Sequence, residues 1–322
     1  MRILCVDVFN PKLINYASPY CGGEVFAKGL EMNGHEVHRF DYRASTNPNE
    51  DLFKIASDLK PEMIWMGKAE RISGEMFGVI KSSFKPTIIK YAADVRAEVL
   101  PDALEHNKYV DHFFGTFGGD YLRKHLFPTM KSVCSILTFT DSSFYKKMKV
   151  KKEWKADVLW TGRPGFGDNK LRNDIILTLR ELKKYDVRMH IDSLSWLGNP
   201  EYLWAINGAK IGIGSNSFNK PKYSSDRLGN YMACGTFYLT QRIEGMNECF
   251  KEGWDYDCFD TIGEMLEKID YYIKNDKERR KIAKNGREKI LKYFDCYPLV
   301  FSMLNTIKNG KPYYPWDDYF EN

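Results

Sequence analysis

The sequence predicts an α/β protein built from two Rossmann-like domains in series, each with a parallel sheet. Short apolar runs of strand length alternate with helical segments from the first residue, which is typical of βαβ units. The alternation restarts after about residue 150, and 322 residues suffice for two domains of roughly 150 residues each. Two such units are expected to leave a cleft between them, with ligands beyond the carboxyl ends of the strands.

The first domain is expected over residues 1–150. Its predicted strands are RILCVDVF, EVHRFDYR, EMIWMG, PTIIKYAAD, DHFFGTF and SVCSILTFTD. The predicted helices between them are EVFAKGLEMNG, DLFKIASDLK and EMFGVIKSSF. A change of periodicity from two to 3.6 residues separates the two kinds of segment.

The second domain is expected over residues 151–297, after a charged linker KVKKEWK (149–155). Its predicted strands are ADVLWTG, VRMHID, KIGIGSN, TFYLTQ and YDCF, and its main helices are LRNDIILTLRELKKY, PEYLWAING, RLGNYMAC, GEMLEKIDYYIKN and KERRKIAKNGREKILKYF. The tail, residues 298–322, begins with an apolar helix and ends in aromatic residues. We expect it to pack back over the domains.

Composition is that of an ordinary globular protein, with 43% hydrophobic and 28% charged residues. The net charge of +5 permits phosphate-bearing partners, whereas nucleic-acid wrappers show denser basic clusters. Seven scattered cysteines without a Cys-x-x-Cys pair argue against a disulfide framework or zinc knuckle. The N-terminus lacks signal-peptide features, and no apolar run reaches the roughly 18 residues of a membrane span. We therefore expect a soluble, cytoplasmic protein without a transmembrane segment.

Two glycine-containing loops after predicted strands could receive an anion. In SPYCGGEVFAKGL, Gly22 and Gly23 precede a helix, so backbone N–H groups could face a phosphate. The G-x-G-x-x-G fingerprint is incomplete, and a tight turn is the alternative. The loop WTGRPGFGDNKLR carries Arg163, Lys170 and Arg172, and guanidinium groups suit phosphate oxygens. The alternative here is a solvated basic loop.

Two further stretches could bind phosphate through helix or turn N–H groups. In SSDRLGNYMACG, Asp226 can cap a helix or lie in its first turn, which puts Arg227 at the positive end of the helix dipole. An arginine there is unfavourable unless an anion occupies the helix N-terminus. Downstream, the turn Glu244-Gly245-Met246 could hold a diphosphate or simply reverse the chain.

These second-half residues resemble the GT-B glycosyltransferases, most closely the group-1, CgeB-like (spore-maturation-type) branch. The resemblance is carried by about 70 residues that begin SSDRLGNYMACGTFYLTQRIEGMNECFKEGWDYDCF. They follow the branch's pattern of an arginine-led helix ending in Ala-x-Gly, a strand, a Glu-Gly loop, an FKEG helix, a strand ending in Phe and two paired helices. The resemblance extends more loosely over WTGRPG, KIGIGSNS and GGEVFAKGLEMNGHEV.

The resemblance implies that the first domain binds the acceptor and the second holds most of a nucleotide-sugar. Arg227 would pair with the diphosphate, and Arg163 and Lys170 fall where the family keeps basic diphosphate contacts. The loop that closes over phosphate and sugar would contain Glu244, Gly245 and Met246, and the residues near the nucleoside pocket would be Phe259, Asp260 and Thr261.

Two positions depart from the related Glu-x7-Glu enzymes, which bind the ribose hydroxyls with a Glu inside this helix. Asn230 stands at that position, and Lys222 stands at the earlier Glu. An Asn can still donate and accept hydrogen bonds, so Asn230 remains a candidate donor-site residue. Ribose recognition and sugar choice do not carry over from the family.

The implied reaction moves a sugar from a nucleoside diphosphate sugar, with a UDP-sugar favoured, to an acceptor hydroxyl. The acceptor could be a glycan, a protein, a small molecule or modified DNA. Arginine, lysine and helix N-termini would stabilise the departing diphosphate, so no metal or other cofactor is expected. Similarity to retaining group-1 enzymes favours retention of configuration. In the first domain, KYAADVR contains Asp94 at a strand end, which could act as general base, orient the acceptor or cap a turn.

Three other interpretations stay open. A basic, aromatic-rich chain could glycosylate a hydroxylated base in DNA, and activity would then fall steeply with salt. The replaced Glu positions also fit a non-catalytic nucleotide-binding protein of the same fold. Asp255-Tyr256-Asp257 spells the D-x-D of metal-dependent GT-A transferases, but it lies late in the chain beside a predicted edge strand. The six histidines show no metal-ligand spacing.

Overall fold

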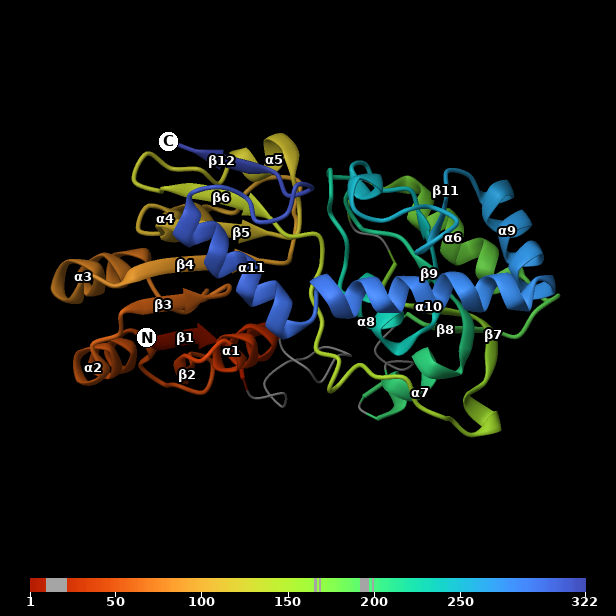
Figure 1. Cartoon of the computed structure of the whole chain (residues 1–322), viewed down its shortest axis with the longest axis horizontal. Helices are drawn as coiled ribbons and strands as arrows, with labels where there is room; N and C mark the ends of the chain where they lie inside the picture. Colours follow the sequence, from red (N-terminus) through yellow and green to blue (C-terminus); the bar gives the residue numbers. More distant parts are fainter. Residues whose placement is uncertain (10–21, 165–166, 168, 192–196, 199) are drawn as a thin grey trace. The chain divides into compact units, whose positions relative to one another are not determined.

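The computed structural model describes residues 1–9, 22–164, 167, 169–191, 197–198 and 200–322. The chain forms two compact units (Figure 1). Unit 1 consists of Met1–Leu137 and Cys296–Asn322, and unit 2 of Thr138–Asp295. Each unit is an α/β domain, and every strand pairing is parallel except one at the edge of the unit 1 sheet.

Unit 1 contains a seven-stranded sheet in the order β12-β6-β5-β4-β3-β1-β2. Its strands are β1 (Arg2–Asp7), β2 (Glu36–Asp41), β3 (Met63–Met66), β4 (Thr87–Ala92), β5 (His112–Gly115), β6 (Ser132–Ser135) and β12 (Tyr319–Glu321). Every residue of β3, β5 and β6 is buried. Such uninterrupted burial is expected for parallel strands covered on both faces.

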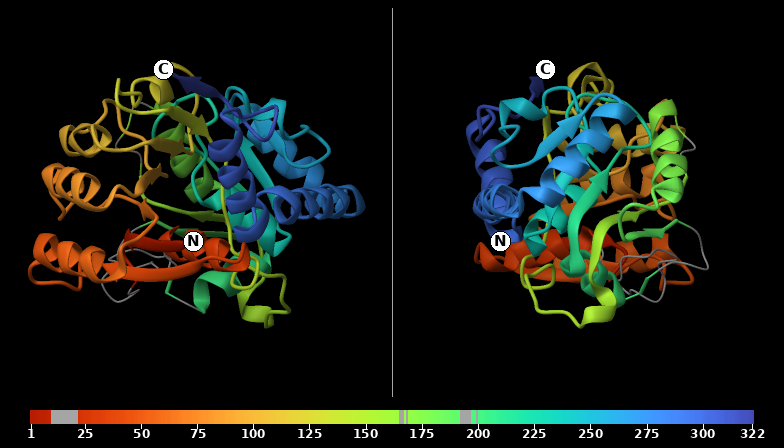
Figure 2. Two further views of the ribbon diagram at one scale, coloured as in Figure 1. Left: turned by 60° about the vertical axis from the view of Figure 1, so that its left-hand side comes forward. Right: turned by 90° about the vertical axis from the view of Figure 1, so that its right-hand side faces the viewer.

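Helices cover both faces of this sheet. They are α1 (Gly22–Met32), α2 (Pro48–Leu59), α3 (Gly74–Phe84), α4 (Pro101–Asn107), α5 (Gly119–Arg123) and α11 (Cys296–Asn309). The first and last of these pack together, and α2, α3 and α4 pack side by side (Figure 2). Capping fixes α3, because the Ser73 hydroxyl accepts a hydrogen bond from the Met76 N–H at 3.3 Å and Lys85 ends the helix in the left-handed conformation.

The order of the strands reverses at β1 in unit 1. β1 pairs with β2 on one side and with β3 on the other, and the later strands extend from β3. This is the topological switch point, beyond which open α/β sheets bind their ligands. Asp7 is the last residue of β1, so it lies at this point.

The C-terminal segment completes unit 1. Gly29 of α1 lets α11 approach closely, because a Cβ there would overlap the Cys296 carbonyl and the Val300 side chain. After α11 the chain continues to β12, which pairs antiparallel with β6. Asp318 secures the turn before it, since its side chain accepts a hydrogen bond from the Gly119 N–H at 2.7 Å. The tail therefore contributes a strand as well as the expected helix.

Unit 2 contains a five-stranded parallel sheet in the order β11-β10-β9-β7-β8. Its strands are β7 (Ala156–Thr161), β8 (Val187–His190), β9 (Ala209–Gly214), β10 (Phe237–Gln241) and β11 (Asp257–Phe259). Its helices are α6 (Lys170–Glu181), α7 (Glu201–Gly208), α8 (Arg227–Cys234), α9 (Ile262–Lys274) and α10 (Asp276–Tyr293), with short 3-10 turns η2 (Lys152–Trp154) and η3 (Met246–Glu248). The switch point of this sheet lies between β7 and β9.

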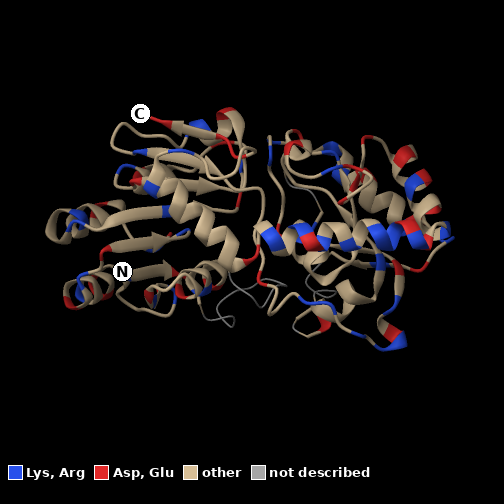
Figure 3. Ribbon diagram, in the orientation of Figure 1, with Lys and Arg blue, Asp and Glu red and all other residues tan. Residues whose placement is uncertain are grey.

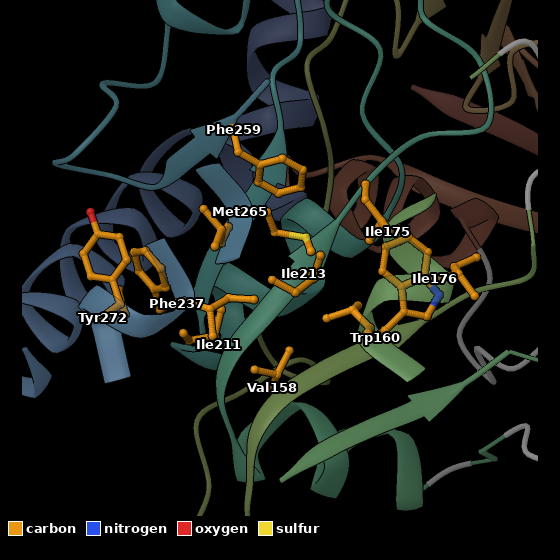
Figure 4. Close-up of a cluster of buried hydrophobic side chains, with 14 of the residues drawn as sticks. Val158, Trp160, Ile175, Ile176, Ile211, Ile213, Phe237, Phe259, Met265 and Tyr272 are labelled. Carbon is orange, nitrogen blue, oxygen red and sulfur yellow. The ribbon is translucent and has the colours of Figure 1, made fainter. Parts of the chain in front are cut away.

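The core of unit 2 joins the sheet to α6, α9 and α10. Figure 4 shows Trp160, Ile211, Ile213 and Phe237 from the strands together with Met265 from α9. Burying an aliphatic or aromatic side chain of this size stabilises the fold by about 1.5–3 kcal/mol. The strands that carry the switch point are therefore rigidly held.

The boundary between the units lies after Leu137, earlier than residue 150. The segment that follows belongs to unit 2 because its backbone is bonded there. The Thr140 N–H donates to the Phe294 carbonyl at 2.9 Å, and the Met148 N–H donates to the Asn207 side chain at 2.8 Å. A Cβ at Gly208 would overlap the Trp154 carbonyl, so the expected linker packs against α7. The second division precedes Cys296, close to residue 297.

Candidate functional site

Two buried arginines lie at the switch point of unit 2. Arg172 comes from α6 and Arg227 opens α8, and only 3% and 8% of their surfaces are exposed. Arg227 donates to the Thr161 carbonyl at 2.8 Å and to the Ser215 carbonyl at 2.6 Å. Arg172 also donates to Ser215 and to the Arg163 carbonyl. Thr161 ends β7 and Ser215 follows β9, so the two guanidinium groups converge where the strand order reverses.

A glycine and a tryptophan shape this arginine pair. Gly162 has φ +119°, which disfavours any residue with a side chain, and a Cβ there would overlap Nη1 of Arg227. The same Cβ would lie 3.2 Å from Nη2 of Arg172. Both guanidinium groups lie over the ring of Trp160, with Cζ 4.9 Å and 5.6 Å from its centroid. Trp160 is fixed in turn, because its indole N–H donates to the Gly162 carbonyl at 3.0 Å.

The charge of the arginine pair is not balanced by a bonded carboxylate. Within the described residues, no Asp or Glu forms a hydrogen bond or ion pair with either guanidinium group, and both Nε atoms are buried without a hydrogen-bond partner. Burial, together with the charge of Arg227, lowers the pKa of Arg172. Two like charges in a poorly solvated place are unfavourable. An anion with several oxygens would accept the spare N–H groups and offset the repulsion.

A polar network holds the strand ends around the pair. The Asn169 amide, which precedes α6, donates to the Gln241 side chain at 2.5 Å and to the Asn216 carbonyl at 2.8 Å. The Ser215 hydroxyl donates to the same Gln241 oxygen at 2.8 Å. Asn216 donates to the Tyr223 carbonyl at 2.6 Å, which fixes the loop before α8. The ends of β9 and β10 and the start of α6 are thus tied together.

Of the basic residues predicted for the diphosphate, only Arg227 lies in this buried pair. The Arg163 and Lys170 side chains are exposed; Arg163 contributes its carbonyl to Arg172, and Lys170 opens α6. Part of this loop, residues 165–166 and 168, lies outside the described residues. Arg172 was named with this loop but was not among the residues assigned to the diphosphate, and its place in the first turn of α6 gave no sign of burial.

Asn230 lies one turn into α8. It is buried, and its amide donates to the Asp226 carboxylate at 3.5 Å. Lys222, eight residues earlier, is also buried and has φ +57°. Its N–H donates to the Glu244 carbonyl at 2.8 Å, and its ammonium pairs with Glu248 at 2.7 Å. The lysine at this position thus anchors the next loop.

That loop has the turn geometry that its sequence predicts. Gly245 has φ +76° and precedes η3 as its N-cap, and a Cβ there would lie 2.9 Å from Cγ of Lys222. The Glu244 side chain is exposed and Met246 is fully buried. Glu244 is therefore the side chain of this loop that solvent or a ligand can reach.

The three residues predicted near the nucleoside have structural contacts. Phe259 is fully buried in the core of unit 2 (Figure 4). Asp260 is exposed and pairs with Arg242 at 2.9 Å. The Thr261 hydroxyl caps α9 by accepting from the Glu264 N–H at 3.2 Å. These contacts account for all three side chains without a ligand.

The D-x-D sequence is also occupied by protein partners. The Asp255 carboxylate pairs with Lys289 at 2.9 Å. Asp257 pairs with Lys268 at 2.9 Å and accepts the Tyr272 hydroxyl at 2.6 Å. Each carboxylate thus faces its own ammonium group, an arrangement that competes with a shared metal ion.

In unit 1, Gly22 opens α1 and Gly23 is buried behind it, while the preceding residues 10–21 lie outside the described chain. A Cβ at Gly23 would lie 2.8 Å from the Asp7 carboxylate.

Asp94, the acid predicted for unit 1, is exposed and pairs with Lys68. The sequence prediction overlooked Asp7, although an acidic residue at the end of the first strand of a parallel sheet is a recognisable signal.

The helices of the described chain are all too short or too polar to cross a bilayer.

Comparison with known proteins supports the fold. Residues 166–298 match the family model described as glycosyl transferase-like, and no curated protein matches the sequence significantly. Three solved structures superpose over 96% of this chain: sucrose-phosphate synthase from Thermosynechococcus elongatus (TM-score 0.65, 12% identity, 98% of that chain), a glycosyltransferase from Rickettsia africae (0.63, 10%, 98%), and Anabaena HepE with UDP (0.59, 12%, 100%). HepE was also solved with UDP-glucose. The chain therefore has the α/β GT-B fold of two parallel-sheet domains.

Proposed function

We propose that this protein is a glycosyltransferase that moves a sugar from a nucleoside diphosphate sugar, with a UDP-sugar favoured, to an acceptor hydroxyl. We further propose that transfer is metal-independent and retaining, and that the chain belongs to the CgeB-like branch. The glycosyl transferase-like match over residues 166–298 supports the activity. The neighbour HepE binds UDP and UDP-glucose, which favours uridine among the nucleotides.

The arginine pair at the switch point of unit 2 carries this proposal. A diphosphate has enough oxygens to accept from both Arg172 and Arg227, and its charge offsets theirs. As the bond from the anomeric carbon to the diphosphate breaks, negative charge grows on the departing phosphate oxygens. Fixed guanidinium groups in a poorly hydrated place stabilise that charge without reorganising, which is the role a metal ion has in other transferases.

Asn230 and Lys222 bear on whether this protein catalyses transfer or only binds a nucleotide. Neither can offer the carboxylate with which Glu-x7-Glu relatives bind their donor, so a nucleotide-binding protein without turnover is the second candidate. Asn230 is buried next to Asp226, and it is the position at which we expect donor choice to change. DNA as acceptor has less support, because acidic residues interrupt the basic ones along α9 and α10 (Figure 3).

The proposal is tested first by donor binding. Thermal unfolding is measured with UDP-, GDP-, ADP- and TDP-sugars, where a ligand at 100 times its Kd stabilises the fold by about 2.7 kcal/mol. Arg227→Ala should remove the shift, and Arg280→Ala, an exposed arginine of α10 paired with Asp276, is the matched control. If none of the nucleotide-sugars changes the melting temperature, the transferase proposal fails.

Turnover is tested by release of UDP from UDP-glucose. Activity that persists in a chelator supports the metal-independent mechanism, and NMR of the product's anomeric proton decides between retention and inversion. Binding without release of UDP under any condition would favour the non-catalytic alternative. If UDP is released at low salt only when duplex DNA with hydroxylated bases is added, a modified base is the acceptor.

A further inference from the structure

A carboxylate occupies the switch point of unit 1. Asp7 ends β1 between β2 and β3. One of its oxygens accepts from the Val8 N–H at 2.8 Å, and the other accepts from the Tyr91 hydroxyl. Each oxygen keeps a further lone pair that could accept a hydrogen bond from a ligand.

Two glycines make room for this carboxylate. A Cβ at Gly23 would lie 2.8 Å from its oxygen, and a Cβ at Gly67 would overlap it. Gly23 belongs to α1 and Gly67 follows β3, so the site is assembled from separate segments. Ala69, two residues on, has φ +51°, a conformation that costs a residue with a Cβ about 1 kcal/mol or more. Strained backbone of this kind clusters at functional sites.

The surroundings of Asp7 favour its neutral form. Burial raises the pKa of the carboxyl to about 6 and the charge of Glu70 adds to the increase, although hydrogen bonds from Tyr91 and Val8 and the positive charge of Lys68 oppose it. Within the described chain, no Lys or Arg side chain hydrogen-bonds to it. A carboxylate that served only the fold would be more stable with a bonded cation, as Asp111 has in Lys81. Asp7 is held in a place that is unfavourable for its charge.

We propose that the Asp7 carboxylate binds the acceptor, by accepting a hydrogen bond from the hydroxyl group that receives the sugar. The expected ligand class is a neutral compound rich in hydroxyl groups, because a carboxylate accepts from hydroxyls and repels phosphate or carboxylate groups. This inference rests on the proposed glycosyl transfer and assigns to unit 1 a group that the family resemblance did not supply.

The test compares donor binding with transfer in an isosteric variant. UDP-glucose is the donor probe, and release of UDP is followed with water and with added glycerol as the hydroxyl compounds. For Asp7→Asn we expect the rate of transfer to fall about 10- to 100-fold, as for loss of a hydrogen bond to a charged group. The Kd of UDP-glucose should stay within about twofold. Asp120→Asn, at an exposed acid of α5, is the matched control.

The pH profile distinguishes a binding role from a structural one. The wild-type rate should fall as the pH drops through about 6, where Asp7 takes up a proton, and this limb should be absent in Asp7→Asn. Tyr91→Phe keeps the carboxylate and removes a hydrogen bond that lowers its pKa, so the limb should move to higher pH. An unchanged limb in both variants would overturn the inference.

The two proposals fail in different ways. If the wild-type chain binds no UDP or UDP-glucose, the proposed function fails irrespective of Asp7. If it binds and turns over UDP-glucose while Asp7→Asn retains the wild-type rate, only the inference about Asp7 fails. Equal losses of UDP-glucose affinity and of rate in Asp7→Asn would also contradict it, because they would indicate a general structural defect.

Discussion

The two switch points of this protein share a design and differ in the sign of their charge. In unit 1 the reversal of strand order presents the Asp7 carboxylate, and in unit 2 it presents the guanidinium groups of Arg172 and Arg227. Both sites depend on a glycine whose Cβ would collide with the charged group, Gly67 in one and Gly162 in the other. The same architecture thus supports opposite chemistry, and the residue types at the strand ends decide which ligand each unit suits.

The charged groups also reach their switch points by different routes. Asp7 lies on the strand itself, and its short side chain stays where the strand ends. Arg172 and Arg227 come from helices, and each long side chain crosses the Trp160 ring to bond the carbonyls beyond β7 and β9. The acid is therefore placed by its strand, whereas each arginine also depends on the carbonyls that its guanidinium group bonds.

Arg227→Ala should produce the largest effect, and it tests the proposed diphosphate site of unit 2. The variant removes a buried cation with two hydrogen-bonded arms, and charge-assisted bonds contribute about 1.5–3 kcal/mol each. We expect the Kd of UDP, measured calorimetrically, to rise about 100-fold or more. Arg227→Lys should recover only part of the affinity, because an ammonium cannot bridge two carbonyls and an anion as a guanidinium does. Unchanged affinity in both variants would contradict the assignment.

Gly162→Ala should have the next largest effect. Its counterpart in unit 1, Gly67→Ala, tests whether the two switch points have separate functions. Alanine at 162 meets a positive φ and Nη1 of Arg227, so we expect the Kd of UDP to rise about tenfold, in line with 1–2 kcal/mol of backbone strain. Alanine at 67 meets Asp7 instead, so it should lower transfer and leave the Kd of UDP unchanged. If each alanine variant changed the Kd of UDP and the rate of transfer equally, the Asp7 site and the arginine pair could not be assigned separate functions.

Asp7→Asn should have a smaller effect, which is a modest increase in the stability of the fold at neutral pH. The folded-state pKa of Asp7 is raised to about 6, so its contribution to stability is fully present below about pH 4 and is lost as the pH rises through 6. Asparagine stays neutral throughout. The melting temperature of Asp7→Asn should therefore exceed that of wild type by about 2–4 °C at pH 8, for a gain of about 1 kcal/mol, and the gain should vanish near pH 4. A lower melting temperature at pH 8 would show that the carboxylate serves the fold.

Asp94→Asn should have the smallest effect. Its carboxylate is exposed and pairs with the exposed Lys68, and such pairs contribute at most about 1 kcal/mol to stability. We expect a rate of UDP release within about fivefold of wild type. A loss as large as that expected for Asp7→Asn would instead support Asp94 as the general base or as the acid that orients the acceptor.

The sequence predicted most of the fold because central strands such as β1, β3 and β9 are buried and stand out as apolar runs. It overlooked α4, α5 and β12, which are short, and β12 pairs with a strand that lies far away in sequence. The turn at Gly245 was predictable, because glycine between a strand and a helical turn is typical of a chain reversal. Phe259 shows the limit of this approach, because a strand-ending aromatic can face a ligand or the core and only packing decides between them.

At the candidate site, helix position was sufficient to predict Arg227 and insufficient for its neighbours. An arginine at the positive end of a helix dipole is locally unfavourable, and that local conflict is visible in the sequence. Arg172 lies in the first turn of α6 and shares this conflict, but its burial becomes apparent only when Trp160, Ser215 and Arg227 are brought around it. Asp7 is recognisable in the sequence as the acid that ends the first strand, whereas the two glycines from distant segments that enclose it become apparent only in the fold.

The return of α11 and β12 to unit 1 has a consequence for how the chain folds as it is synthesised. Unit 2 is continuous in sequence, so it can fold as soon as Asp295 has left the ribosome. Unit 1 begins first and finishes last, because the groove beside Gly29 stays uncovered and β6 remains an open edge until Tyr319–Glu321 is made. The nascent unit 1 therefore exposes an open strand edge, a feature that favours aggregation, while the rest of the protein is translated.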